Sequence, residues 1–262
     1  SARTRALRPF FAMEVMERAL AIDRAGHAVA HMEVGEPDLP APPAAVEACR
    51  RALTQGETRY TDSRGLLELR EVIAAQAQSR TGVEVDPDRI VVTQGTSPAM
   101  LLIFGLLLEP GDEVILPEPH YPAYPNLVRF FGGVPVPVAT HPGDRWKIAP
   151  DAVRRAITPR TRALVLSSPA NPTGAVQDPE NARALAELGI PIISDEIYDG
   201  IVYEGCAPTP GLALDPDAFV IDGISKRYAM TGFRLGWAIV PDGARRGLQT
   251  MLQNFFISSN AF

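Results

Sequence analysis

The chain has 262 residues, of which 46% are hydrophobic, and its formal net charge is −6. A chain of this length and composition can bury a sizeable core, so we expect a globular protein. The acidic balance, without any block rich in Lys and Arg, argues against a nucleic-acid-binding protein.

Three further features narrow the class of protein. The longest apolar run, Leu101–Leu108, is far shorter than the ~20 residues of a bilayer span, so we expect no membrane partner. Cys49 and Cys206 lie far apart and the histidines show no paired spacing, so we expect no metal, reduced thiols and a cytoplasmic location. The arginine-containing N-terminus is not followed by the apolar segment of a secretory signal.

Hydrophobic patterns predict helices that alternate with strands. Residues 1–35 indicate an N-terminal arm and helix separate from a main domain over residues 36–262. Helices are then expected at Pro43–Gln55, Leu66–Arg80, Pro98–Leu108, Ala123–Phe131, Pro150–Ile157 and Pro179–Leu188. Strands are expected at Ile90–Thr93, Glu113–Leu116, Val134–Val138, Ala163–Ser167, Pro191–Ser194, Ala218–Asp222 and Leu235–Val240.

This alternation predicts an α/β fold with a mostly parallel seven-stranded sheet and helices on both faces. The strand at Leu235–Val240 follows the preceding loop without room for a crossover helix. We therefore expect it to run antiparallel to its neighbour.

The segment from Gly223 to Gly236 places Lys226 among small residues and Arg234 eight positions further on. A lysine near another cation can lose its proton near neutral pH and attack a carbonyl, while an arginine suits a phosphate. The pair suggests a lysine that binds pyridoxal phosphate. A surface Lys and Arg flanking a turn is the alternative interpretation of this segment alone.

Three other loops follow predicted strands, where ligands of open α/β sheets bind. Gly95-Thr96-Ser97 precedes a helix and predicts an anion site at the helix N-terminus, or an ordinary helix cap. Asn171, in a proline-stiffened loop with X-Pro bonds that can be cis, offers a donor and an acceptor, or belongs to a plain turn. Asp195 ends a strand expected to be buried, so it needs a partner, unless it only caps the next helix.

Together these motifs resemble the class I/II aminotransferases of the aspartate aminotransferase superfamily, which are fold type I pyridoxal phosphate enzymes. The resemblance extends over nearly the whole chain and rests on the order and spacing of four segments. They are Gly95-Thr96-Ser97, Asn171-Pro172-Thr173-Gly174, Asp195-Glu196-Ile197-Tyr198 and Gly223 to Gly236. It implies a three-layer α/β/α large domain, and it places the 1–35 arm in a smaller domain.

The resemblance also implies roles for the residues around the cofactor ring. Lys226 would form a Schiff base with pyridoxal 5'-phosphate and then shuttle the proton at the substrate Cα. Asp195 would pair with the pyridinium nitrogen, which makes the ring an electron sink. Tyr198 and Asn171 would bond the ring's phenolic oxygen, and Tyr121 would stack on the ring face.

Further residues are implied to bind the phosphate, the substrate and a second subunit. Gly35 would line the substrate site near the carboxylate, together with Asn171. Tyr60 would reach the cofactor phosphate of the other subunit, which implies a homodimer with composite sites. The phosphate cradle would consist of Gly95, Thr96, Ser97, Ser225 and Arg234.

The implied activity is an aminotransferase, EC 2.6.1.-, that moves an amino group from an L-amino acid to a 2-oxo acid. A C–S β-lyase or a decarboxylase of the same fold, or a non-catalytic cofactor-binding fragment, remains an alternative. Family members continue beyond the equivalent of Phe262 with a smaller domain that supplies a carboxylate-binding arginine, so we expect that domain to lie outside this chain. A Gly-x-Gly-x-x-Gly dinucleotide motif and a Gly-x-Ser-x-Gly hydrolase motif are both missing from the sequence.

Ser97 bears on the choice of amino donor. Some bacterial family members that favour acidic amino acids place a lysine at this position, where its ammonium can meet a side-chain carboxylate. Serine brings no charge, so desolvation of a second carboxylate would go uncompensated. We therefore expect a neutral aliphatic or aromatic donor, with 2-oxoglutarate or pyruvate as acceptor.

Overall fold

A seven-stranded sheet forms the centre of the computed structural model, which describes residues 1–261. The strand order is β1-β7-β6-β5-β4-β2-β3. The strands are β1 (Ile90–Thr93), β2 (Glu113–Glu118), β3 (Val134–Ala139), β4 (Thr161–Ser167), β5 (Ile192–Asp195), β6 (Phe219–Gly223) and β7 (Gly236–Ile239). Strands β2 to β6 pair in parallel, and β7 pairs antiparallel with both β1 and β6, as the sequence predicted.

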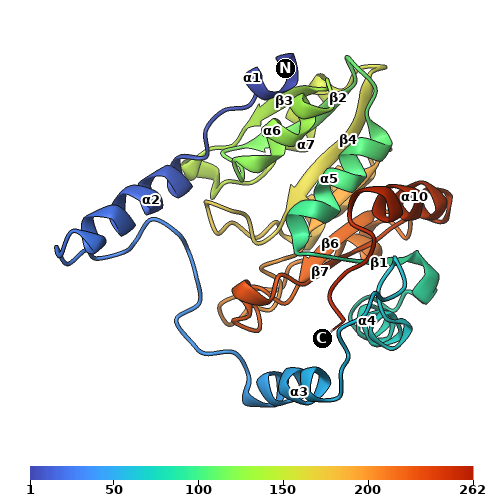
Figure 1. The fold of residues 1–262 in the computed structure, drawn as a ribbon. Coiled ribbons are helices and arrows are strands. Elements are labelled where there is room, and N and C mark those ends of the chain that lie inside the picture. The colour runs from blue at the N-terminus through green and yellow to red at the C-terminus, as the bar shows by residue number, and fades with distance from the viewer. Residues whose placement is uncertain (262) are drawn as a thin grey trace.

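Helices cover both faces of the sheet (Figure 1). Helices α5 (Thr96–Leu107), α6 (Ala123–Phe130) and α10 (Arg245–Phe255) pack in one apolar core. Helices α4 (Leu67–Thr81), α7 (Pro150–Ala156), α8 (Pro179–Ala186) and α9 (Gly211–Leu214) pack in the other. The predicted three-layer arrangement is therefore confirmed.

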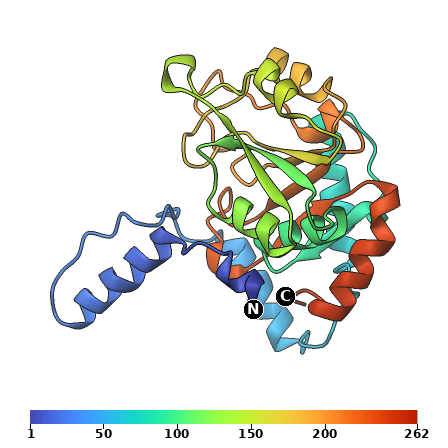
Figure 2. The same ribbon diagram turned by 90° about the horizontal axis from the view of Figure 1, so that it is seen from above.

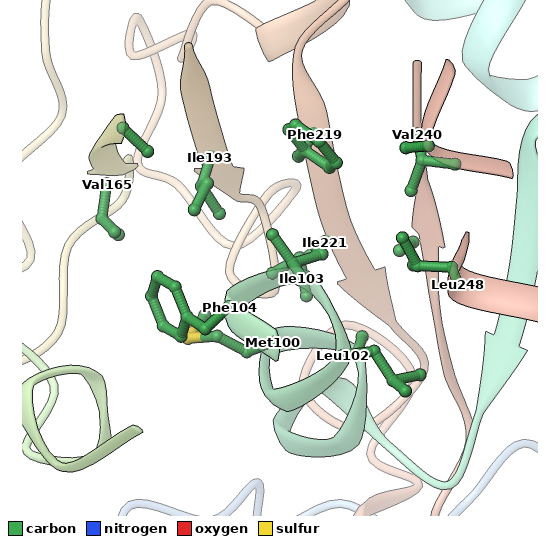
Figure 3. Close-up of a cluster of buried hydrophobic side chains, with 14 of the residues drawn as sticks. Met100, Leu102, Ile103, Phe104, Val165, Ile193, Phe219, Ile221, Val240 and Leu248 are labelled. Carbon is green, nitrogen blue, oxygen red and sulfur yellow. The ribbon is translucent and has the colours of Figure 1, made fainter. Parts of the chain in front are cut away.

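Helix α5 lies at the centre of the first core. Its side chains Leu102, Ile103 and Phe104 are fully buried, and Ile103 and Phe104 lie on the side of the helix that faces Ile193 and Ile221 (Figure 3). The strands read as continuous apolar runs because helices cover both of their faces. Each fully buried side chain of this size contributes about 1.5–3 kcal/mol to folding, so this core fixes the strand ends that carry the polar loops.

The N-terminal region lies largely outside this body. Helix α2 (Phe11–Arg24) projects away from the sheet (Figure 2), and helix α3 (Pro43–Thr54) buries no side chain. The short helix α1 (Ala2–Arg5) contacts α6, and Arg8 and Asn126 exchange two hydrogen bonds of 2.9 Å. The division of the chain at residue 35 stays a prediction.

The predicted elements are all present, with shifted ends. Helix α5 begins at Thr96 rather than Pro98, because Pro98 occupies the first turn, where its missing N–H costs nothing. Helix α10 lies in residues 242–260, a segment for which no helix bounds were predicted. None of the helices over residues 1–261 has the length and apolar character that a bilayer span requires.

Candidate active site

The loops singled out in the sequence meet at one edge of the sheet. Strands β5 and β6 are parallel, so the loops carrying Asp195 and Lys226 leave from the same edge. The antiparallel strand β7 begins at this edge, so Arg234, two residues before it, lies there too. The pairing of Thr93 with Gly236 brings the turn after β1 alongside.

The groups of the predicted phosphate cradle lie close together where β1 leads into α5. Gly95 adopts a left-handed φ of 94°, and a Cβ there would lie 2.6 Å from Nη2 of Arg234. A Cβ on Gly236 would lie 2.7 Å from the carbonyl carbon of Gly95. No side chain caps the first turn of α5, so its N–H groups at Thr96 and beyond point outward. A guanidinium beside free helix N–H groups is the chemistry of a phosphate site.

Lys226 occupies the half-buried loop after β6. Its Nζ donates a 2.7 Å hydrogen bond to the carbonyl oxygen of Gly35, which ties the N-terminal segment to the site. Burial lowers the pKa of Lys226 and the Arg234 cation lowers it further, while the Glu36 carboxylate opposes them. The net direction is toward the neutral amine, in the sense expected from a nearby cation.

Asp195 ends β5 and is 6% exposed. Its Oδ2 accepts a 2.7 Å hydrogen bond from the Tyr124 hydroxyl, and its Oδ1 accepts one of 3.2 Å from the backbone N–H of Ile197. Burial raises the pKa of Asp195, and these two donors partly offset that rise. The partner that the buried carboxylate needed is therefore Tyr124.

Tyr121, Tyr198 and Asn171 surround Asp195. Nδ2 of Asn171 donates to the Tyr198 hydroxyl over 3.3 Å. Burial raises the pKa of Tyr121 and of Tyr198, and the charge of Asp195 raises both further, so all three groups share one site. The Ser97 side chain opposes that rise in pKa at Tyr121, so Tyr121 also lies close to the cradle loop. The Ser168–Pro169 and Asn171–Pro172 bonds are cis.

Two predicted residues stand apart from these contacts. Ser225 is buried beside Lys226, but Tyr60 is 80% exposed. A cavity of about 540 Å³ is lined by Asn171 and Tyr198 together with the loop around Tyr203. The cavity adjoins the site through Asn171 and Tyr198, and Lys226 and Asp195 are not among its lining residues.

Sequence reasoning missed two residues of the site. Tyr124, which is 2% exposed, lies one helical turn after Tyr121, and that i, i+3 spacing was the available signal. Glu36 follows Gly35 directly, hydrogen-bonds the Thr231 hydroxyl and acts on Lys226. Its contact joins segments 195 residues apart, which no local pattern predicts.

The family model for aminotransferase class I and II matches residues 28–261. The chain belongs to this family. Its members use pyridoxal phosphate, so the family's chemistry agrees with the lysine, carboxylate and phosphate-cradle pattern of the site.

Relatives in the family have several substrate names. The chain is 43% identical over 245 residues to a probable aspartate/prephenate aminotransferase of Thermus aquaticus, covering 92% of this chain and 64% of that protein. It is 38% identical over 256 residues to a valine–pyruvate aminotransferase of Mycobacterium tuberculosis, covering 95% and 65%. The chain therefore spans less than two thirds of the length of these relatives.

Solved structures in the family have the same fold. Aspartate aminotransferase from Thermus thermophilus with maleate superposes with a TM-score of 0.96 at 40% identity, covering all of this chain and 69% of that one. Alanine aminotransferase from Pyrococcus furiosus gives a TM-score of 0.91 at 36% identity, covering 100% and 70%.

Proposed function

We propose that this chain binds pyridoxal 5'-phosphate and contributes the cofactor half of an aminotransferase site. The observation that supports this most is the convergence of a depressed-pKa lysine, a buried carboxylate and a cationic helix N-terminus at one sheet edge. A Cβ on Gly95 would clash with Nη2 of Arg234, so the glycine lets this guanidinium lie against the turn before α5, where the two together would hold a phosphate. Thr96, Ser97 and Ser225 add hydroxyl donors to this cradle.

The chain's own residues then divide the work. When bound, the cofactor supplies an electron sink for the charge that develops at the amino acid Cα. Lys226 would take and return the Cα proton, a role that requires its neutral amine, and burial lowers its pKa in that direction. Asp195, held by Tyr124, would pair with the cofactor's ring nitrogen. Tyr198 and Asn171 would bond its phenolic oxygen, and Tyr121 would stack on the ring.

The proposed reaction transfers an amino group from an L-amino acid to a 2-oxo acid. The names of the relatives support it, since aspartate, prephenate, valine and pyruvate all belong to such reactions. Gly35 and Asn171 would line the substrate site. A C–S β-lyase or a decarboxylase would use the same residues, so the product decides between them.

The decisive experiment uses the small number of lysines. Lys147 and Lys226 are the only lysines among the 262 residues. Pyridoxal phosphate followed by borohydride is expected to attach a group to the peptide containing Lys226, and Lys147→Arg is expected to leave this unchanged. Labelling of Lys147, or persistent labelling in Lys226→Ala, would contradict the proposal.

The reaction is tested on the full-length protein with an amino acid and 2-oxoglutarate. A transaminase forms the keto acid and glutamate in equal amounts. Keto acid and ammonia without glutamate would indicate a lyase, carbon dioxide a decarboxylase, and no turnover a binding protein.

A further inference from the structure

Five charged residues form a cluster beside the site, and the sequence analysis assigned none of them a role. They belong to α4, to the loop after β5, to the end of β6 and to the lysine loop, and we call them the Arg80 cluster. Its members are Arg80, Glu196, Asp199, Asp222 and Arg227.

Arg80 connects three separate parts of the sheet edge. Its Nη2 lies 2.9 Å from Oε2 of Glu196 and 2.5 Å from Oδ2 of Asp199, and its Nη1 lies 3.5 Å from Oδ2 of Asp222. Glu196 directly follows Asp195, and Asp199 directly follows Tyr198. One guanidinium on α4 therefore holds both ends of the Asp195–Tyr198 loop.

Arg227 joins that loop to the lysine loop. Its Nε donates to the backbone oxygen of Asp199 over 2.7 Å, and its Nη2 donates to Oδ2 of Asp199 over 2.6 Å. The loop fits closely around this side chain, because a Cβ on Gly200 would lie 2.8 Å from Nε of Arg227. Arg227 and Asp199 are the immediate neighbours of Lys226 and Tyr198 in the sequence. Their hydrogen bonds therefore connect the backbone next to one site residue with the backbone next to the other.

Two acids of the cluster are buried and have further donors, while Arg80, Asp199 and Arg227 are partly buried. Glu196 is 5% exposed and accepts from the Ser194 hydroxyl at 3.0 Å and from the N–H of Gly211 at 2.7 Å. Asp222 is 4% exposed and accepts from the N–H of Gly223 at 2.7 Å. Burial raises the pKa of Asp222 to about 7, and Arg227 and Arg80 oppose that rise. The three acids of the cluster contact two arginines, and because Asp222 is partly protonated near pH 7 the acids together carry less than three negative charges.

We infer that Arg80 and Arg227 are positioning residues that hold Lys226 at a fixed distance from Tyr198 and Asp195. The inference rests on the proposed function for its catalytic meaning. The physical reason is that bidentate arginine bonds in a buried setting are strong and directional, so both loops lose their freedom to slide. Displacement of a reacting group by about 1 Å can cost on the order of 100-fold in rate.

The test compares Arg227→Met, which removes the bridge, with Arg227→Lys, which keeps the charge without the fork. Arg162→Met is the matched control, because Arg162 pairs with Asp112 at 2.9 Å near the opposite edge of the sheet. The first readout needs no cofactor. Lys226 and Lys147 are acylated in competition across a pH range, and peptide mass spectrometry gives the reactivity of each amine.

The midpoint is the pH at which acylation of a lysine reaches half of its maximal rate. In Arg227→Met the midpoint of Lys226 is expected to rise toward that of an ordinary lysine, because a loosened loop admits water. Arg227→Lys is expected to lie between that variant and the unmodified chain, and Arg162→Met is expected to match the latter. On the full-length enzyme, kcat of Arg227→Met should fall about 100-fold, while Arg162→Met stays within about twofold. An unchanged Lys226 midpoint in a cooperatively folded Arg227→Met would overturn the inference.

One further variant covers the case in which Arg227→Met fails to fold. Asp199→Asn keeps the shape of the acceptor and weakens both arginine contacts, and it is expected to shift the Lys226 midpoint in the same direction. An unmodified enzyme that neither binds cofactor nor transfers amino groups would instead refute the proposed function. The acylation result would still decide whether the cluster positions Lys226.

Discussion

The pairing of Tyr124 with Asp195 shows what a buried carboxylate requires at the residue scale. Its two oxygens accept hydrogen bonds from two neutral donors, the Tyr124 hydroxyl and the Ile197 N–H, and among residues 1–261 no arginine forms an ion pair with it. No internal cation therefore neutralises this carboxylate, and its negative charge is available to a ligand. Asp199 is the contrasting case, because two guanidinium groups contact it.

Tyr124→Phe removes the side-chain hydroxyl that donates to Asp195 and leaves the backbone N–H of Ile197 as its donor. A hydrogen bond to a charged group contributes about 1.5–3 kcal/mol, so the free energy of unfolding should fall by a similar amount. The pKa of Asp195 should rise further, because the donor that offsets burial is lost. Urea unfolding and cofactor affinity measure both effects. Tyr203→Phe, at a 92% exposed position, serves as control and should change neither.

Ser97→Lys tests the source of donor preference. A lysine beside Tyr121 would place an ammonium in the cradle loop, so kcat/KM for aspartate should increase relative to leucine and phenylalanine. The measurement is a donor panel on the full-length enzyme before and after substitution. An unmodified enzyme that already prefers aspartate to alanine, leucine, methionine and phenylalanine would refute the expected neutral donor.

The residues of the site were predictable where they belong to local motifs. Lys226, Asp195 and Gly95 each follow a strand, and a parallel sheet brings such positions to one edge. Spacing from Tyr121 pointed to Tyr124, but its bond to Asp195, 71 residues away, was not predictable. Glu36 was not predictable, because its role depends on contacts between segments distant in the sequence. The Arg80 cluster was missed for the same reason, since α4 approaches the edge only in the folded chain.

At the scale of elements, the close crossing of the β1–α5 turn and β7 determines how much space the cradle has. Gly236 faces the backbone of Gly95, and backbone atoms cannot move aside as a flexible side chain can. The elements themselves were predicted almost completely, since apolar runs covered on both faces are a strong signal. Helix α10 was given no bounds in advance, although its apolar residues Leu248, Met251 and Leu252 recur at helical spacing.

Gly236→Ala is expected to lower the free energy of unfolding by about 1–3 kcal/mol through overpacking. The same substitution should weaken cofactor binding, because relief of the contact displaces Gly95. Gly243→Ala is the matched control, since a Cβ there meets no atom within 4 Å. Equal stability of the two variants would show that the β1–β7 contact is looser than described.

The turn after α2 is expected to respond to pH. His31 lies 2.6 Å from Asp23 and 2.7 Å from Glu33, and the hydrogen bond to Glu33 is the larger cause of its raised pKa. The bond to His31 in turn lowers the pKa of Glu33. The His31 contribution is complete below about pH 6.5 and is lost as pH rises through its raised pKa. The Glu33 contribution is present above about pH 4.5 and is lost on acidification.

Amide hydrogen exchange measures this turn directly. Val29 and Met32 donate their N–H groups to Asp23 and Glu33. Their protection, corrected for intrinsic rates, should be greatest between about pH 4.5 and 6.5 and should decrease by pH 8. His31→Gln should abolish the decrease, and a pH-dependent decrease that persists in this variant would assign the effect to other groups.

At the scale of the whole molecule, the exposed apolar surface is concentrated in the N-terminal third. Phe11, Met32, Leu39 and Val72 are each more than half exposed, as is Tyr60. Such a surface suits contact with another protein surface. It supports the proposal of a homodimer in which Tyr60 reaches the partner's cofactor phosphate.

Tyr60→Phe should therefore weaken cofactor retention in the full-length protein without changing its fold. Dialysis followed by absorbance measures retention, and analytical ultracentrifugation measures the assembly. The expected effect is a faster loss of cofactor from an intact dimer, because only one phosphate contact is removed. A fully active monomer would contradict both the dimer and the role of Tyr60.

The pairing of β1 with β7 has a consequence for the order in which the molecule can form. Val92 pairs with Trp237, so the two strands that carry the cradle are separated by most of the chain. Closure of so long a loop is entropically costly and slow, and it cannot precede synthesis of the second strand. During translation the helices and parallel strands can assemble first, while Gly95 and Arg234 stay apart. The capacity to capture a phosphate therefore arises late, when β7 inserts between β1 and β6.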